Sequence, residues 1–531
     1  MSTLVGTGSL LRFILRRDRV RLSLWVFGLV TLMTVSAQSV ASLYGTTAEI
    51  EAYAATVGDN PALTMFAGPG YGFDHPSAGV ILVNETTLWM ALGCAVMSVF
   101  LVVRHTRVEE DSERADLIRS TVVGRHALMA ATVIAAAGAN VLVAAGCATA
   151  TTACGFPPVG SIALCAGVGL VGLVVAAATA VAVQIAATGR GALGLGIGFV
   201  LLSFVARGIG DVTVPILSWF TPFGWGIGVR AFAGERWWAL GGLAVAVVGC
   251  FAAAAALSVR RDLGSGLLRQ RPGAEFATPW MCSPLGLNLR LQWASTAAWA
   301  IGITVAGLVY GSVADDIDSF IADNPELAEY LIRSGGGSLV DSYLAMALRM
   351  VGVVVSGFAI ASVLRARSEE AAGFAESLLA APVRRWWWLG SHLVVTVCSV
   401  VALMALSGAA LGLTYSASVG DWSNVVELGL DSLTMAPAVL VLAGIATVLF
   451  GWIPRGSLVA WAALVVVAVI EVFAEVLDLP HLLRMVSPFE LVPAVPVEGW
   501  NGLPLVLVVA AAGVLHGLGL VGFCRRDLAI A

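Results

Sequence analysis

The densest groups of ionisable side chains lie in two segments, residues 104–126 and 365–386. Both carry an Arg-x-Glu-Glu pattern, followed by a further acid and a further arginine. The members are Arg107, Glu109, Glu110, Asp116 and Arg125 in the first segment, and Arg367, Glu369, Glu370, Glu376 and Arg385 in the second. Early acids and late arginines favour helices, because they complement the helix dipole. Such a charged helix could bind a partner protein.

A solvated loop is the alternative for both segments. Arginines on one side of a membrane are explained by topology alone, but acids contribute little to topology. Since Glu-Glu stands in both segments, we favour a docking surface over a solvated loop.

Four further charges lie within apolar segments, where charge is costly and is a functional hypothesis by default. Arg207 and Asp211 stand in one such segment, and Glu471 and Glu475 stand at matching places in another. We expect Arg207 and Glu471 to pair and help to close an outer gate. An Arg207–Asp211 pair within one helix and simple exposure at the membrane interface are the alternatives.

Motifs for catalysis or metal binding are missing from the sequence. It has no G-x-S-x-G, H-E-x-x-H or C-x-x-C pattern, and no basic surface of the kind that binds nucleic acid. All 29 basic residues are arginine. A phosphate-binding loop needs a lysine to reach the β- and γ-phosphates of ATP, so an ATP-driven process would need its ATPase on another chain.

Composition points to the elements that must hold these residues. The chain has 531 residues, of which 59% are hydrophobic and only 12% are charged, whereas soluble domains carry about 25% charged residues. The sequence therefore predicts an all-α polytopic membrane protein. Segments of membrane-spanning length are expected at 22–44, 81–103, 127–150, 160–187, 192–212, 238–258, 293–313, 342–364, 387–414, 426–452, 457–477 and 503–523.

The arginines predict the orientation of these spans. With the N-terminus in the cytoplasm, most arginines fall in the inner segments, and the outer segments are acidic. Both termini are then cytoplasmic. Residues Leu10–Leu22 are expected to form a basic amphipathic helix lying on the inner membrane face.

The second half of the chain repeats the first. Five motifs return in the same order about 260 residues further on; they are Asp59-Asn60-Pro61, Arg107-x-Glu109-Glu110, Arg190-Gly191, Thr221-Pro222-Phe223 and Arg260-Arg261-Asp262-Leu263. Each half would hold six spans, so the repeat is parallel, a geometry typical of a transport pathway. The expected divisions are a first half at 1–261, a cytoplasmic linker at 262–290 and a second half at 291–531. The two X-Pro-Phe motifs are expected to form turns too short to span the membrane.

The segment 365–386 resembles the coupling helix of type-2 ABC exporter permeases, and in particular that of fused twelve-span actinobacterial subunits for tetronasin, other polyketide antibiotics or multidrug efflux. The matching residues are Glu369, Glu370, Gly373, Glu376, Leu378, Leu379, Pro382, Val383 and Arg385. The first segment departs from the pattern at Glu113, Asp116 and Val122. The resemblance covers essentially the whole chain.

The resemblance implies a partner, a separate ABC ATPase with one copy under each half. ATP and Mg²⁺ would bind that partner, and this chain would carry no cofactor or metal. It would act as a subunit in the bacterial plasma membrane that exports lipophilic or amphipathic compounds by alternating access. A proton-driven antiporter using Glu471 or Asp431 is the alternative. A polytopic membrane enzyme is a third class, for which we find no cluster of acids or histidines in a loop.

Overall fold

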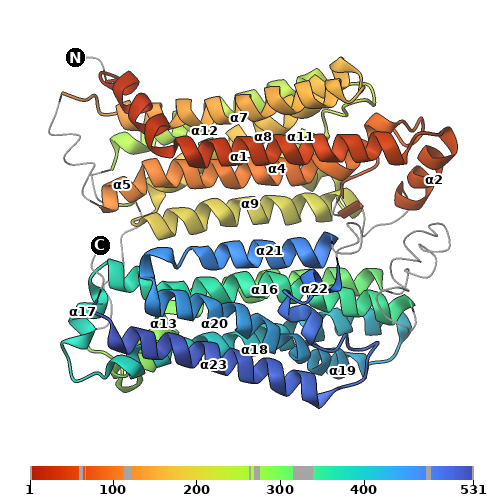
Figure 1. Cartoon of the computed structure of the whole chain (residues 1–531). Helices are drawn as coiled ribbons and strands as arrows, with labels where there is room; N and C mark the ends of the chain where they lie inside the picture. Colours follow the sequence, from red (N-terminus) through yellow and green to blue (C-terminus); the bar gives the residue numbers. More distant parts are fainter. Residues whose placement is uncertain are drawn as a thin grey trace. The chain divides into compact units, whose positions relative to one another are not determined.

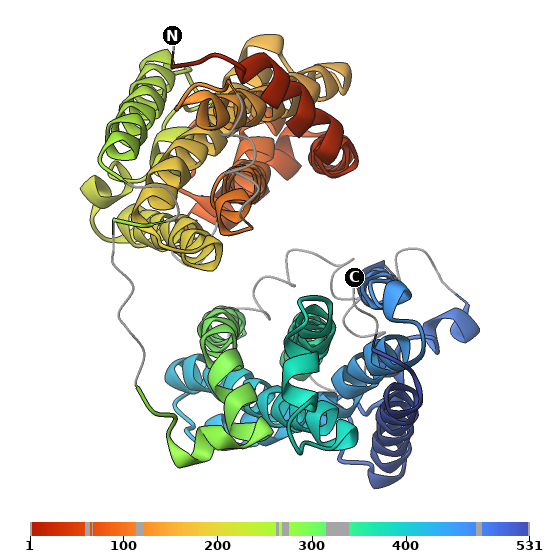
Figure 2. The same cartoon turned by 90° about the vertical axis from the view of Figure 1, so that its left-hand side faces the viewer.

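The computed structural model describes residues 3–58, 64–65, 67–112, 122–261, 265–267, 275–314, 339–473 and 480–528. Asp116 and Glu475 lie outside these ranges, as do the Asn60-Pro61 motif and its repeat. All elements within the described ranges are helices. Contacts divide the chain into two compact units, Met1–Gly273 (unit 1) and Ala274–Ala531 (unit 2). Figure 2 views the helices of each unit nearly end-on.

Unit 1 is a bundle of long helices joined by short ones (Figure 1). Its elements are α1 (Thr7–Leu43), α2 (Thr47–Gly58), α4 (Ala78–His105), α5 (Arg107–Asp111), α7 (Ala127–Ala153), α8 (Pro158–Ile185), α9 (Gly189–Val212), α10 (Pro215–Ser218), α11 (Pro222–Ile227) and α12 (Trp237–Val259).

Unit 2 follows a similar order of long and short helices. Its elements are η1 (Pro279–Cys282), α13 (Pro284–Val313), α16 (Leu339–Ala371), α17 (Phe374–Leu379), α18 (Arg385–Val419), α19 (Asn424–Asp431), η2 (Ser432–Met435), α20 (Ala436–Trp452), η3 (Pro454–Gly456), α21 (Val459–Phe473), α22 (His481–Arg484), η4 (Pro488–Leu491) and α23 (Gly502–Arg525).

Within the described residues, 12 helical stretches are long and apolar enough to cross a membrane. Each predicted span falls on one of them, so the all-α polytopic fold is confirmed. Local signals set several of their starts. The side chains of Ser77, Thr188 and Ser283 cap α4, α9 and α13 by accepting a hydrogen bond from a backbone N–H three residues on.

Small residues let the helices pack closely. A Cβ on Gly311 of α13 would lie 2.1 Å from the carbonyl oxygen of Leu411 in α18. In unit 1, a Cβ on Gly172 of α8 would lie 2.0 Å from Oδ1 of Asn140 in α7. Helix packing in lipid depends on such close approaches, because burial of apolar surface gives little drive there.

Residues Leu10–Leu22, expected to form an amphipathic helix on the inner membrane face, are helical and continuous with the first span; their position on the membrane stays a prediction. The helix α1 runs without a break from Thr7 to Leu43. One residue of its basic stretch, Asp18, is 3% exposed and contacts Arg104 and His105 at the end of α4. These ion pairs hold the stretch against the bundle as part of the first long helix.

The described parts of the segment expected as a linker, 262–290, contact unit 1 near its start and form helices near its end. The backbone N–H of Leu267 bonds to the carbonyl of Gln184 at the end of α8. The elements η1 and the first turns of α13 also fall inside it, because Pro284 and the Ser283 cap start that helix before residue 291.

The two X-Pro-Phe motifs form short helices before the last long helix of each unit. Thr221 caps α11 and Ser487 caps η4 through their hydroxyl groups. Phe223 and Phe489 are each at most 1% exposed. As predicted, neither helix is long enough to span a membrane.

Candidate functional site

The charged segment of each unit lies at one end of its bundle, which we call the arginine-rich end. In unit 1, α4 ends there at His105 and α5 follows, at the same end as the N-terminus (Figure 1). In unit 2, α16 ends there, α17 follows and α23 finishes close by. The opposite end of each unit is called the far end.

Glu110 is the centre of the arginine-rich end in unit 1. Arg261, just after α12, grips both of its carboxylate oxygens, with Nη1–Oε2 at 2.8 Å and Nη2–Oε1 at 2.6 Å. Arg107 adds a third bond at 2.7 Å and also donates to the carbonyl of Ser265 at 3.0 Å. The side chains of Arg261 and Glu110 are 6% and 7% exposed. The carboxylate is therefore enclosed by guanidinium groups.

Glu370 holds the same place in unit 2. Arg526, just after α23, grips it with Nη1–Oε1 at 2.6 Å and Nη2–Oε2 at 2.8 Å. The Arg526 guanidinium also lies 5.1 Å from the ring centres of both Phe450 and Phe523. We call the pairs Glu110–Arg261 and Glu370–Arg526 the Glu–Arg clamps.

The neighbouring glutamates are also paired inside their units. Glu109 contacts Arg17 of α1. Glu369 contacts Arg365 at 3.1 Å and His392 of α18 at 3.5 Å. Because partners from the same unit surround these carboxylates, their docking role stays a prediction, and any effect on a partner would run through the helices that they position.

The C-terminal part of each charged segment also contacts the end of the last long helix of its unit, α12 or α23. Arg125 donates to the carbonyls of Ser258 and Val259, each at 3.0 Å, at the end of α12. Arg385 donates to the carbonyl of Arg526 at 2.7 Å. Arginines near a helix C-terminus satisfy carbonyls that have no partner within the helix.

In the second segment, the short helix α17 carries exposed side chains. Gly373 starts it with φ +78°, a conformation that glycine adopts without strain. Phe374 is 64% exposed and Glu376 is also exposed. Among the candidates described in this segment, Glu376 is the acid that is free to meet a partner. Its counterpart Asp116 lies outside the described residues.

At the far end of unit 1, Arg207 is fully buried and paired within its own unit. Its Nη1 lies 3.0 Å from Oδ2 of Asp211, and its Nη2 donates to the carbonyl of Met65 at 2.7 Å. Ser218 donates to the other oxygen of Asp211 at 2.6 Å. The intrahelical pair, our alternative to the gate, is confirmed.

Glu471 at the far end of unit 2 is also surrounded by its own unit. It accepts a hydrogen bond from Ser487 and lies 3.6 Å from Arg349, which contacts Glu490 at 3.1 Å. Pairing of Arg207 with Glu471 stays a prediction, because the two residues belong to different units. Glu475 lies outside the described residues.

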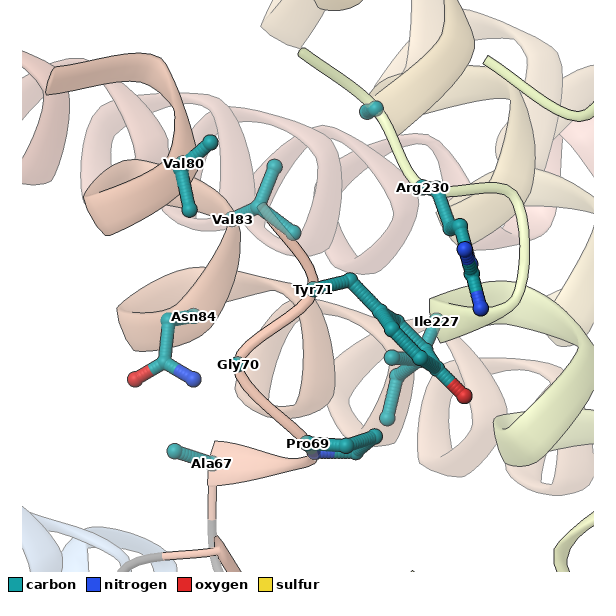
Figure 3. A pocket seen from close by; sticks show the side chains of 10 residues that line it. Ala67, Pro69, Gly70, Tyr71, Val80, Val83, Asn84, Ile227 and Arg230 are labelled. Atoms are coloured by element: carbon teal, nitrogen blue, oxygen red, sulfur yellow. The ribbon is translucent and has the colours of Figure 1, made fainter. Parts of the chain in front are cut away.

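A small pocket at the far end of unit 1 was not predicted. Arg230 lies 4.1 Å from the ring centre of Tyr71, with Asn84 on the opposite side (Figure 3). The backbone at Arg230 has φ +52°, a conformation that costs energy for any residue other than glycine.

The polar side of the pocket includes Asn84, which accepts a hydrogen bond from Tyr53 at 3.0 Å. Burial, and then the nearby Glu85 carboxylate, raise the pKa of Tyr53, so its hydroxyl stays a donor. No sequence motif indicated this pocket, because its lining comes from α4, from the segment before α4 and from α11 and the residues after it, which only the fold brings together.

Among the described residues, no group of three or more His, Cys, Asp or Glu side chains is arranged to hold a metal ion. The candidate charges described above, except Glu376, contact partners of their own unit.

Comparison with known proteins gives two findings. A family model described as "Multidrug efflux system permease Rv1217c, C-terminal domain" matches residues 281–524. The chain is also 36% identical to the multidrug efflux system permease protein Rv1217c of Mycobacterium tuberculosis. That similarity covers 99% of this chain and 96% of the relative.

Proposed function

Since the chain belongs to the family of multidrug efflux system permeases, we propose that it is the membrane subunit of an ATP-driven ABC exporter. It is a multi-pass protein of the bacterial plasma membrane. The compounds that it exports would be lipophilic or amphipathic, as drugs and antibiotics are. A separate ATPase, present in two copies, would supply the energy and bind ATP and Mg²⁺.

One observation supports this proposal above the others. At the arginine-rich end of unit 2, the middle of the segment that resembles a coupling helix folds as the short helix α17, between α16 and α18, with Phe374 and Glu376 exposed. An exposed aromatic beside an acid is a surface suited to a partner protein. The missing lysine agrees with this, because the chain lacks a phosphate-binding loop of its own.

In this mechanism, closure of the ATPase dimer moves the charged segment of each unit and switches the pathway from inward- to outward-facing. The permease holds the charged segments in place and transmits their movement, and the ATPase hydrolyses ATP. A ligand or partner can shift such an equilibrium only as far as it binds the two states differently.

The test is reconstitution in lipid. We expect the full chain to copurify with an ABC ATPase encoded beside it, and efflux substrates to stimulate ATP hydrolysis by the complex. Transport by the permease alone, driven by a pH gradient, would contradict the proposal and favour the proton-coupled antiporter.

A further inference from the structure

The Glu–Arg clamps connect two motifs that are far apart in the sequence. Glu110 and Arg261 are 151 residues apart, and Glu370 and Arg526 are 156 residues apart. The intervening chain therefore differs in length by a full helical turn or more between the units. The same bidentate contact nevertheless forms in both units. The contact is therefore kept although the number of residues between its partners differs.

Each clamp has a second tie beside it. Arg125 in unit 1 and Arg385 in unit 2 donate to carbonyls at the end of α12 or α23. The charged segment thus contacts the end of the last long helix at two points. Near its start the contact is made by Glu110 or Glu370, and near its end by Arg125 or Arg385. Since both attachments are short and directional, the helix end must follow the segment when it moves.

The last long helix of each unit, α12 or α23, directly follows a short helix that lies near the buried charges of the far end. The short helix α11 precedes α12, and Ser218, three residues before Thr221 of the X-Pro-Phe motif, donates to Asp211 of the Arg207 pair. In unit 2, η4 precedes α23, and its cap Ser487 donates to Glu471. In each unit, α12 or α23 therefore lies between the charged segment and a buried carboxyl group at the far end.

We propose that Glu110, Glu370, Arg261 and Arg526 are positioning residues of the transport cycle. In each unit the clamp transmits movement of the charged segment to the last long helix, and through it to the far end. This inference rests on the proposed function, since it needs an ATPase to move the segment. Arginine is required because its planar fork binds both carboxylate oxygens, whereas lysine is a point charge.

Neighbouring residues provide a matched control. Arg260 and Arg525 each stand directly before a clamp arginine, and both are exposed. The double variant Arg261→Gln/Arg526→Gln and the control Arg260→Gln/Arg525→Gln lose the same charge from the same helix ends. They differ in whether the lost side chain binds a glutamate, together with the carbonyl and ring contacts that the clamp arginines also make.

The experiment measures drug transported per ATP hydrolysed by the reconstituted complex, together with its thermal unfolding. We expect Arg261→Gln/Arg526→Gln to lower this ratio about tenfold while ATP hydrolysis continues, and the control to stay within about twofold of the wild type. Arg261→Lys/Arg526→Lys should recover part of the ratio. A merely structural role would lower hydrolysis and transport together, which would overturn the inference.

The outcomes separate this inference from the proposed function. If no ATPase copurifies with the wild type, the proposed function fails. If the wild-type complex transports and Arg261→Gln/Arg526→Gln has an unchanged ratio, only the clamp role fails. If that variant does not fold, Glu110→Asp/Glu370→Asp replaces it, because it keeps both charges and shortens their reach. A ratio lowered in this variant supports the clamp role, and an unchanged ratio contradicts it.

Discussion

Arg207 has no exposed surface and depends on Asp211 and the Met65 carbonyl for its bonds. A charge buried within a membrane segment persists only where the surrounding groups satisfy it. The same holds for Glu471, with Ser487 and Arg349 beside it. At this scale, Arg207 and Glu471 each have polar partners within their own unit.

We expect Arg207→Met to destabilise unit 1, because it leaves the Asp211 carboxylate buried without its counter-ion. Breaking one side of a buried pair costs about 3–5 kcal/mol. The double variant Arg207→Met/Asp211→Leu should be more stable than the single variant, since no uncompensated charge remains. Thermal unfolding in detergent measures both. A double variant that is less stable than Arg207→Met would show that the pair is not the source of the effect.

At the scale of single helices, close packing at glycine decides which helices can meet. Gly311 of α13 has backbone and side-chain atoms of α18 where a Cβ would stand, whereas Gly302 of the same helix has open space. Gly311→Ala is therefore expected to push α13 away from α18, at a cost of about 1–3 kcal/mol. Gly302→Ala is the control and should be close to neutral. Equal unfolding temperatures for the two variants would contradict this reading of the interface.

The short helix α17 carries a second prediction at this scale. Phe374→Asp and Glu376→Lys alter exposed side chains and should leave the unfolding temperature unchanged. If α17 docks an ATPase, each should lower the amount of ATPase that copurifies by about tenfold. The control is Glu427→Lys, which changes an exposed acid on α19 at the far end of unit 2 (Figure 1). Undiminished copurification of the ATPase with both α17 variants would count against docking at this helix.

At the scale of the whole molecule, each unit has its own buried core. One buried cluster joins α4, α8 and α9 in unit 1, and another joins α16, α18 and α20 in unit 2. The boundary between the two units falls between Gly273 and Ala274. A compact unit with its own core can in principle fold alone.

We therefore expect a chain cut between Gly273 and Ala274 to be tolerated. The two pieces, expressed together, should insert in the membrane and unfold at temperatures close to that of the intact protein. A cut after Pro157, between α7 and α8, divides a unit and should destroy it. Loss of stability on cutting at Gly273 as severe as on cutting at Pro157 would mean that the units do not fold independently.

Sequence patterns predicted a large part of this architecture. The number and places of the long helices follow from apolar length, which each segment carries by itself. The pattern of Leu10–Leu22 indicated a helix but not its contacts, because the partners of Asp18 come from α4. The intrahelical Arg207–Asp211 pair was available as an alternative, since a spacing of four residues on a helix is a local relation.

The sequence by itself determined the twelve apolar helices found among the described residues, the repeat and the positions of the charged segments, because these depend on local composition and order. Only the tertiary structure decided the partners of those charges. Glu110 finds Arg261 and Glu370 finds Arg526 across more than 150 residues of chain. The packing of α12 and α23 against their bundles fixes which guanidinium group each carboxylate meets, and no local pattern carries that information.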